Sequence, residues 1–296
     1  KLRENGTDVK TEVIAGITTF MTMAYILAVN PSIMSAAGMD SGAVFTATAL
    51  AALLGTVLMA VFANYPFALA PGMGLNAYFA YTVVGVYGYS WKVALTAVFA
   101  EGIIFIILSA TNVREAIFNA IPKNLKAAVS VGIGLFIAFI GLQNAKIVIG
   151  GSTLLQLYSL DNYNAANGVK ATFHDVGITV LLAIIGILIT GILVIRNIKG
   201  NILWGILITW LLGIGCQFAG IYVPNPDVGF YSLLPDFSNG LSIPSIAPVF
   251  AKLDFHSMFS LNFIVVVFAF LFVDMFDTIG TLIGVSSKAT MLDEDG

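Results

Sequence analysis

Charged side chains are scarce in this sequence. Asp, Glu, Lys and Arg make up 10% of the 296 residues, hydrophobic residues make up 58%, and the mean hydropathy is +0.95. A soluble domain carries about 25% charged residues. No charged residue occurs between Ser41 and Trp91, a run that can hold two membrane spans at about 20 apolar residues each. The composition excludes a soluble protein and predicts a multi-pass protein of the cell membrane, with the lipid bilayer as its surroundings.

Cysteine and histidine are also rare, which limits the chemistry the chain can perform. Cys216 is the only cysteine, so neither an intrachain disulfide nor a thiol-rich metal site can form. His174 and His256 fall outside the predicted spans, and the zinc-protease pattern HExxH is absent. An intramembrane enzyme would need a nucleophile with a base, or a set of metal ligands. We therefore expect no catalytic residues, no metal or other cofactor, and no nucleic-acid partner.

Eight apolar segments predict eight membrane-spanning helices. The charged N-terminus lacks a signal-peptide cleavage pattern, so the first span is expected to be retained. The segment 112–126 is short and amphipathic and is expected to lie at the membrane interface, and Asn30 before Pro31 is expected to end the first helix. The predicted spans are Val13–Ser35, Ala43–Asn64, Phe67–Tyr87, Val93–Ala110, Ala127–Ala145, Val176–Ile195, Asn201–Ile221 and Met258–Ser287.

The distribution of basic residues predicts the orientation of these spans. With the N-terminus in the cytoplasm, the outer loops hold Lys92, Lys146, Lys170 and Lys252, and the other nine of the thirteen basic residues lie inside. This bias follows the positive-inside rule. The inner residues are Lys1, Arg3, Lys10, Arg114, Lys123, Lys126, Arg196, Lys199 and Lys288.

The third predicted span is interrupted near its middle by Pro71, Gly72 and Gly74. Proline cannot donate the helical hydrogen bond and disfavours helix in the residue before it. An extended segment Phe67–Gly72 of about 20 Å, followed by a helix Met73–Val86 of about 21 Å, would cross the roughly 30 Å hydrocarbon core with the junction near the midplane. A simple proline kink is the alternative.

A helix that starts inside the membrane offers unpaired backbone N–H groups to a ligand. Non-helical backbone at that depth survives only when it is buried in protein or lines a cavity, and secondary transporters build substrate sites in this way. Asn76, in the first turn of the helical half, can supply both a donor and an acceptor. The break therefore predicts half of a substrate site.

Three ionisable residues lie within the predicted spans: Glu101, Asp274 and Asp277. Such residues indicate a functional site, because burying charge in hydrocarbon is costly. Asp274 and Asp277 are spaced i and i+3 and share one helix face, so their repulsion would let one of them take up and release a proton. If the span ended at Val273, both would be interfacial instead. Glu101 could line the site or pair structurally with a polar side chain of a neighbouring helix.

Several long motifs resemble the nucleobase:cation symporter family of xanthine and uracil permeases, in its azaguanine-permease-like branch of guanine, hypoxanthine and adenine permeases. The motifs are "TEVIAGITTFMTMAYILAVNP" at Thr11–Pro31, "GAVFTATALAA" at Gly42–Ala52, "APGMGLNAYFAYTV" at Ala70–Val83 and "FVDMFDTIGTLIG" at Phe272–Gly284. The resemblance covers essentially the whole chain.

The resemblance implies an all-α polytopic fold of fourteen segments in two inverted repeats of seven, divided into a core and a gate domain. Its third and tenth segments each carry a short strand at the substrate site. Residues 1–296 would be one incomplete transporter domain with about eight segments: 1–221 would form the first repeat and 258–287 the first segment of the second. A homodimer through the gate domain is also implied.

The resemblance further assigns roles to individual residues. Asp277, in the pattern acid-x-I-G, would hydrogen-bond the nucleobase, Asn76 would be the third-segment asparagine, and Asp274 the branch's additional acid. Relatives that take uracil have histidine at the position of Thr281.

These roles predict a proton-coupled symporter that imports purine nucleobases, with guanine and hypoxanthine as the first candidates and adenine as a further one. The substrate-binding candidates are Asp277, Asn76, Gly74, Ala77, Tyr78, Phe79 and Thr281, and the proton-coupling candidates are Asp274, Asp277 and Glu101. The alternative is an anion transporter or channel of the related sulfate-transporter-type fold, against which the two aspartates argue.

Overall fold

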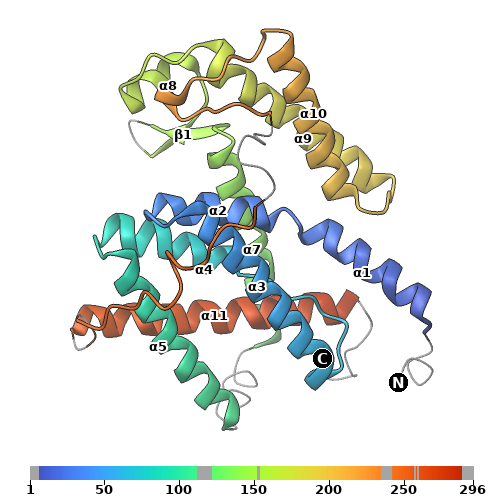
Figure 1. Ribbon diagram of the computed structural model, residues 1–296, viewed down its shortest axis with the longest axis vertical. Coiled ribbons are helices and arrows are strands. Elements are labelled where there is room, and N and C mark those ends of the chain that lie inside the picture. The colour runs from blue at the N-terminus through green and yellow to red at the C-terminus, as the bar shows by residue number, and fades with distance from the viewer. Residues whose placement is uncertain are drawn as a thin grey trace. The chain divides into compact units, whose positions relative to one another are not determined.

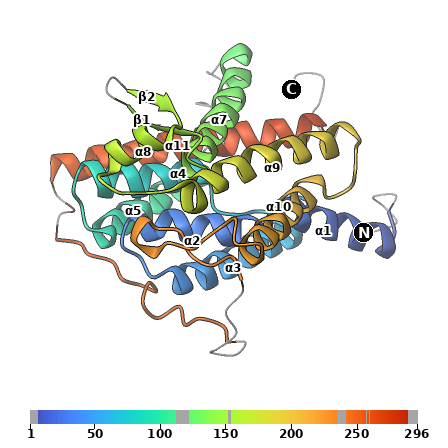
Figure 2. The ribbon, with the colours of Figure 1, turned by 90° about the horizontal axis from the view of Figure 1, so that it is seen from above.

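The computed structural model describes residues 7–111, 122–151, 154–234, 242–256, 258 and 260–288. The chain divides into two compact units. Unit 1 comprises Lys1–Tyr25 and Phe139–Ser242, and unit 2 comprises Ile26–Ala138 and Ile243–Gly296. Figures 1 and 2 show the helices of both units.

The described residues confirm a mostly helical multi-pass membrane protein. Six stretches are long and apolar enough to cross a membrane, and they correspond to six of the eight predicted spans. The third and fifth predicted spans instead contain the shorter apolar helices Met73–Val86 and Gly134–Asn144. The six long stretches are Val9–Ala36, Ser41–Ala63, Trp91–Ala110, Phe173–Ile195, Asn201–Phe218 and Leu261–Ser286.

The first span consists of two helices, α1 (Val9–Met23) and α2 (Ile26–Ala36), separated by a turn at Ala24 and Tyr25. The prediction that a helix ends at Asn30 is wrong, because α2 continues through Pro31. Proline inside a helix costs about 3 kcal/mol. Burial of the neighbouring Ile33 and Met34 in the core of unit 2 offsets this cost.

The second and third spans meet in a non-helical connection. Helix α3 (Ser41–Leu58) continues as the π-helical turns η1 (Met59–Ala63), which end at Asn64 in the left-handed conformation with φ 56°. Residues 64–72 then form neither helix nor strand. The hydroxyl of Thr56 on α3 holds this segment, since it accepts a hydrogen bond from Leu69 N at 3.0 Å and lies 3.3 Å from Leu69 O.

The helical half of the third span begins at Met73, as the sequence predicts. It comprises α4 (Met73–Ala77) and the π-helical η2 (Tyr78–Val86), and Gly72 before it is extended, with φ −71° and ψ 124°. The preceding half is non-helical, but a strand also needs the hydrogen bonds of a neighbouring strand. Among the described residues, none pairs with 64–72 in this way.

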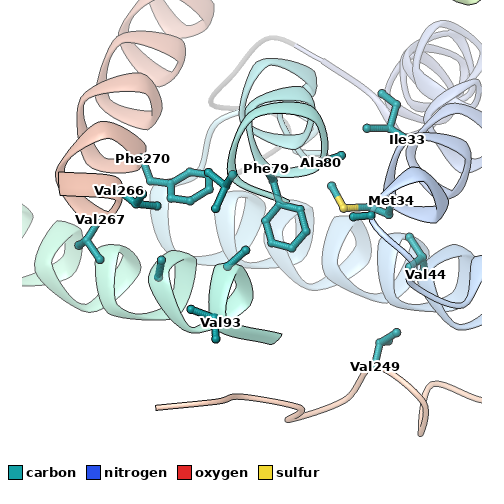
Figure 3. Close-up of a cluster of buried hydrophobic side chains, with 14 of the residues drawn as sticks. Ile33, Met34, Val44, Phe79, Ala80, Val93, Val249, Val266, Val267 and Phe270 are labelled. Carbon is teal, nitrogen blue, oxygen red and sulfur yellow. The ribbon is translucent and has the colours of Figure 1, made fainter. Parts of the chain in front are cut away.

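The core of unit 2 lies where α2, α3, η2, α5 (Trp91–Ala110) and α11 (Leu261–Lys288) meet. Phe79 of η2 is buried beside Phe270 of α11, with Met34 of α2 on its other side (Figure 3). Such apolar contacts hold the broken third span against α11. They place Gly72 near Asp277 of that helix.

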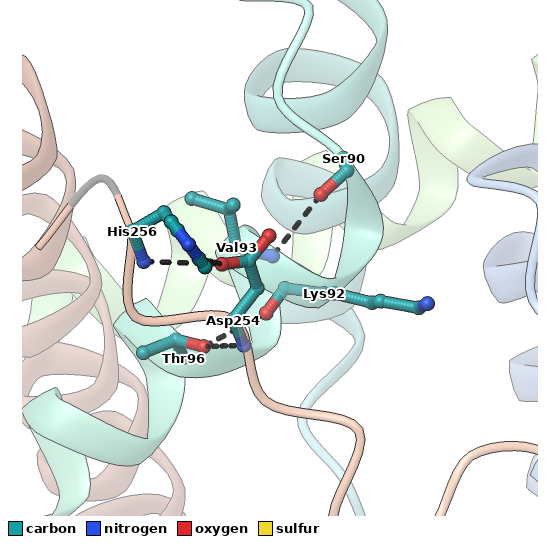
Figure 4. A network of polar contacts seen from close by, with 6 residues as sticks. All are labelled: Ser90, Lys92, Val93, Thr96, Asp254 and His256. Atoms are coloured by element: carbon teal, nitrogen blue, oxygen red, sulfur yellow. Dashed lines mark hydrogen bonds and ion pairs between the residues drawn. The ribbon is translucent and has the colours of Figure 1, made fainter.

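The irregular segment 242–256 is held to the N-terminal ends of α3 and α5. Thr46 donates to Pro244 O at 2.8 Å, and Thr96 accepts from Asp254 N at 2.8 Å (Figure 4). The backbone N–H and the ring of His256 bond to the Asp254 carboxylate at 3.0 and 2.9 Å. These bonds hold the pKa of Asp254 below its usual value, so this carboxylate stays charged at neutral pH.

Unit 1 is built around α9 (Ile178–Ile195) and α10 (Asn201–Phe218), which lie side by side (Figures 1 and 2). The π-helical η3 (Phe173–Gly177) extends α9 at its N-terminus, so His174 lies at the end of a span and not outside it as predicted. Its Nδ1 lies 3.0 Å from Ile221 O.

The remaining elements of unit 1 surround this pair. A two-stranded antiparallel hairpin, β1 (Val148–Gly150) and β2 (Leu155–Leu157), departs from the predicted all-α class. Helix α8 (Leu160–Asn167) and the 3₁₀ turn η4 (Pro226–Val228) complete the unit. The fifth span is α7 (Lys123–Asn144). It includes the end of the predicted interfacial helix, whose residues 112–121 lie outside the described part of the chain.

Candidate functional site

The break in the third span lies against Asp277 of α11. A Cβ atom placed on Gly72 would lie 2.5 Å from Oδ2 of Asp277. The carboxylate therefore approaches the backbone at the start of α4, where no side chain caps the helix. Two segments about 200 residues apart thus bring an acceptor-only carboxylate beside the N-terminus of a helix, which favours negative charge.

Asn76 is joined to the first and second spans by a chain of hydrogen bonds. Its Nδ2 donates to Oδ1 of Asn30 at 2.6 Å, and Asn30 Nδ2 donates to Oγ1 of Thr48 at 2.7 Å. The Thr48 hydroxyl donates in turn to Val44 O at 2.7 Å. Asn30 and Thr48 are buried, so an unpaired polar atom there would be costly.

Only one assignment of donors and acceptors is consistent with this series of hydrogen bonds. A hydroxyl has a single hydrogen, and Thr48 gives it to Val44 O. Thr48 must therefore accept from the amide NH₂ of Asn30, whose carbonyl oxygen then accepts from Asn76. One N–H of the Asn76 amide is used by Asn30, which leaves its second N–H and its carbonyl oxygen for other partners.

The two acids of α11 have different neighbours. Asp277 approaches Gly72, whereas Asp274 lies close enough to Glu101 of α5 for the two carboxyl groups to interact. Glu101 is 5% exposed. The sequence predicted that Asp274 and Asp277 would repel each other, and that Glu101 would line the site or pair with a polar side chain such as Asn or Thr of a neighbouring helix. Spacing along one helix could not reveal this contact with α5.

The remaining candidate residues differ in their surroundings. Ala77 and Phe79 are buried, and Phe79 contributes to the core of unit 2. Tyr78 is less buried and packs edge-on against Phe270, with ring centroids 5.0 Å apart. A Cβ on Gly74 would lie 3.9 Å from Phe136 of α7. Thr281 lies one turn beyond Asp277 and is exposed.

The sequence did not point to Asn30 or Thr48 as parts of this site. Both lie in motifs that carry the family resemblance, but a polar side chain before a proline and a threonine within an apolar span are common in structural roles. Among the described residues, no three of His, Cys, Asp and Glu are grouped as ligands for a metal ion. The polar groups brought together here suit hydrogen bonds to a small molecule.

Comparisons with known proteins place this arrangement in a known family. Residues 10–293 match the Permease family. A protein of Methanocaldococcus jannaschii named as a permease is 49% identical over 98% of this chain and 60% of its own length. The guanine/hypoxanthine permease PbuO of Bacillus subtilis is 42% identical over 98% of this chain and 62% of its length. The adenine permease AdeP of Escherichia coli is 40% identical over 100% of this chain and 60% of its length.

The chain spans about three fifths of the length of these curated relatives.

Proposed function

Because this chain belongs to the Permease family, we propose that the protein imports purine nucleobases together with protons. Guanine and hypoxanthine are the first candidates and adenine the next, since relatives of about 40% identity are named as permeases for these bases. The protein is proposed to be a transporter, with no catalytic residues.

The observation that carries this proposal is the approach of Asp277 to Gly72 at the break of the third span. A discontinuous helix facing an acid inside the membrane is the arrangement on which many secondary transporters build a substrate site. In this site the Asp277 carboxylate accepts hydrogen bonds from a ring N–H or an exocyclic amino group of the purine. The backbone from Gly74 to Ala77 lies beside it.

Asn76 is proposed to read another edge of the purine through its carbonyl oxygen. One N–H of its NH₂ group donates to Asn30, and this bond orients the amide so that its carbonyl oxygen can accept from an N–H donor of the ligand. Of the two aromatic candidates, Tyr78 is the better placed to pack on a purine ring, because Phe79 is buried in the core. Thr281 remains a candidate at the exposed end of the site.

The proposed fold is the family's two inverted repeats of seven segments, with residues 1–221 as the first repeat and 258–287 as the start of the second. Unit 2 is proposed as part of the core domain and unit 1 as part of the gate domain. The location of Gly72, Asn76, Asp277 and their partners within unit 2 supports this assignment. A homodimer is proposed to form through the gate domain.

The proposal is tested with the protein at its full natural length in liposomes. An inward proton gradient should drive uptake of radiolabelled hypoxanthine, and guanine and adenine should compete more strongly than uracil. Asp277→Asn should reduce uptake at least tenfold, since it removes a charged hydrogen-bond acceptor worth about 1.5–3 kcal/mol. Gly72→Ala should also weaken binding, because its Cβ displaces the carboxylate.

Gly16→Ala is the matched control for Gly72→Ala, since a Cβ on Gly16 meets no atom within 4 Å. It should transport as the unsubstituted protein does. Absence of purine uptake by the unsubstituted protein, or normal transport by Asp277→Asn, would reject the proposed function.

A further inference from the structure

Glu101 of α5 and Asp274 of α11 form a pair of acids distinct from the proposed contact between purine and Asp277. The two helices pack against each other, and the two carboxyl groups lie close enough to interact. Glu101 is 5% exposed. Its Oε1 has no hydrogen-bond partner among the described residues.

A hydrogen bond between two carboxyl groups requires a proton. An ionised carboxylate only accepts hydrogen bonds, whereas a protonated one also donates. Two ionised carboxylates in contact would repel each other in a medium of low dielectric constant. A hydrogen bond between Glu101 and Asp274 therefore needs one shared proton, and Oε1 of Glu101 is a further buried acceptor with no partner among the described residues.

The other ionisable groups on the elements packed against α5 make contacts elsewhere. Helix α5 packs against η2 and α11. On α11, Asp277 approaches Gly72, and on η2 the Tyr78 hydroxyl interacts with Tyr87. Lys92 lies at the first turn of α5, over the ring of Trp91. Among the described residues, no cation is paired with Glu101, so its charge is balanced by a proton.

We infer that the Glu101–Asp274 pair binds the transported proton, while Asp277 binds the purine. This inference rests on the proposed function and assigns its two ligands to two different places. A proton from the outer solution binds the pair and changes its charge from −2 to −1, and the same proton leaves to the inner solution. No other bond is made or broken.

Helix α11 connects the two places. Asp274 and Asp277 are three residues apart, less than one helical turn. When the pair is protonated, its hydrogen bond joins α5 to α11. When the proton leaves, repulsion between the carboxylates favours separation of the two helices and moves Asp277 relative to Gly72. Purine affinity and protonation are therefore coupled through one rigid element.

The test measures how far the full-length protein in liposomes accumulates radiolabelled hypoxanthine at zero membrane potential. For one proton per purine, the ratio of inner to outer hypoxanthine should rise about tenfold for each unit of imposed pH difference. Glu101→Gln and Asp274→Asn should abolish this dependence and leave a ratio near one. Both variants should still bind hypoxanthine and exchange it across the membrane without a gradient.

Three controls separate the possible outcomes. Glu12→Gln removes an exposed carboxylate in the first turn of α1 and should keep the tenfold dependence. Asp277→Asn should lose binding itself. The double variant Glu101→Gln/Asp274→Asn, whose amides can hydrogen-bond to each other, replaces either single variant that fails to fold.

The inference is overturned if a folded variant of the pair retains the dependence on the pH difference, or if it loses binding as Asp277→Asn does. Failure of the proposed function gives a different result. In that case the unsubstituted protein neither binds nor accumulates hypoxanthine.

Discussion

Thr48 has a larger role at the level of single residues than its place in an apolar span suggests. It accepts from Asn30 while donating to Val44 O, and so fixes the orientation of two asparagine amides. Thr48→Val keeps the side-chain shape and removes the hydroxyl. It leaves the buried Asn30 amide without its acceptor, at a cost of about 1–3 kcal/mol. We expect a lower melting temperature and an affinity for hypoxanthine reduced up to roughly tenfold, measured by equilibrium binding.

Thr48→Ser is the matched control, because it keeps the hydroxyl and loses only a methyl group. It should bind hypoxanthine nearly as well as the unsubstituted protein. Equal weakening by serine and valine would mean that packing at this position, and not the hydrogen bond, supports Asn76.

The sequence singled out Asp277 and Asn76 because the family resemblance assigns a role to each, and because Asn76 follows the break of the third span and Asp277 is an acid within a span. It did not indicate the role of Thr48 or the contact between Glu101 and Asp274, because these depend on which faces of the helices pack against each other. Three-residue spacing places Asp274 and Asp277 on one face of α11. It does not say what packs against that face.

At the level of elements, the predicted break in the third span is confirmed, but residues 64–72 do not form the strand that the resemblance implies. Pro71 and Gly72 exclude a continuous helix on local grounds, and the helix does begin at Met73. Whether the extended half joins a ladder depends on a second segment with which it must exchange hydrogen bonds. In the same way, the packing of Ile33 and Met34 overrides the local signal at Pro31.

The close packing of α9 and α10 rests on two glycines that face threonines of the opposite helix. A Cβ on Gly186 would lie 2.5 Å from Oγ1 of Thr209, and a Cβ on Gly205 would collide with the hydroxyl of Thr190. Each threonine hydroxyl is hydrogen-bonded to a carbonyl of its own helix, at 2.8 Å from Thr190 to Gly186 O and 2.7 Å from Thr209 to Gly205 O. Small residues of this kind let membrane helices approach closely.

Gly205→Ala should therefore destabilise unit 1, although alanine is the better helix former. Overpacking costs about 1–3 kcal/mol, which lowers the melting temperature by several degrees in a thermal scan of the detergent-solubilised protein. The additional substitution Thr190→Ala should recover part of the loss, since it removes the atoms that the new methyl group meets.

Gly191→Ala on α9 provides the comparison, because a Cβ there meets no atom within 4 Å. It should leave the melting temperature unchanged or raise it slightly. If Gly205→Ala behaved in the same way as Gly191→Ala, the two helices would not be held by this contact.

For the whole molecule, the positive-inside rule predicts which ends of the helices share a side of the membrane. Within unit 2, the segment 242–256 contacts the N-terminal ends of α3 and α5 through Thr46 and Thr96. Within unit 1, His174 at the start of α9 accepts at its carbonyl from Val223, just after α10. The predicted orientation places all these regions on the outer side of the membrane. The contacts agree with the predicted alternation, and the orientation itself stays a prediction.

That orientation can be tested by labelling, because Cys216 is the only cysteine of the chain. In a Cys216→Ser background, single cysteines replace Lys170, before η3, and Lys199, between α9 and α10. A membrane-impermeant maleimide should label Lys170→Cys in intact cells and Lys199→Cys only after permeabilisation. The loop of Lys199 also carries Arg196, and such basic loops stay in the cytoplasm. Labelling of Lys199→Cys alone in intact cells would invert the orientation, and labelling of both would mean that α9 does not separate the two loops.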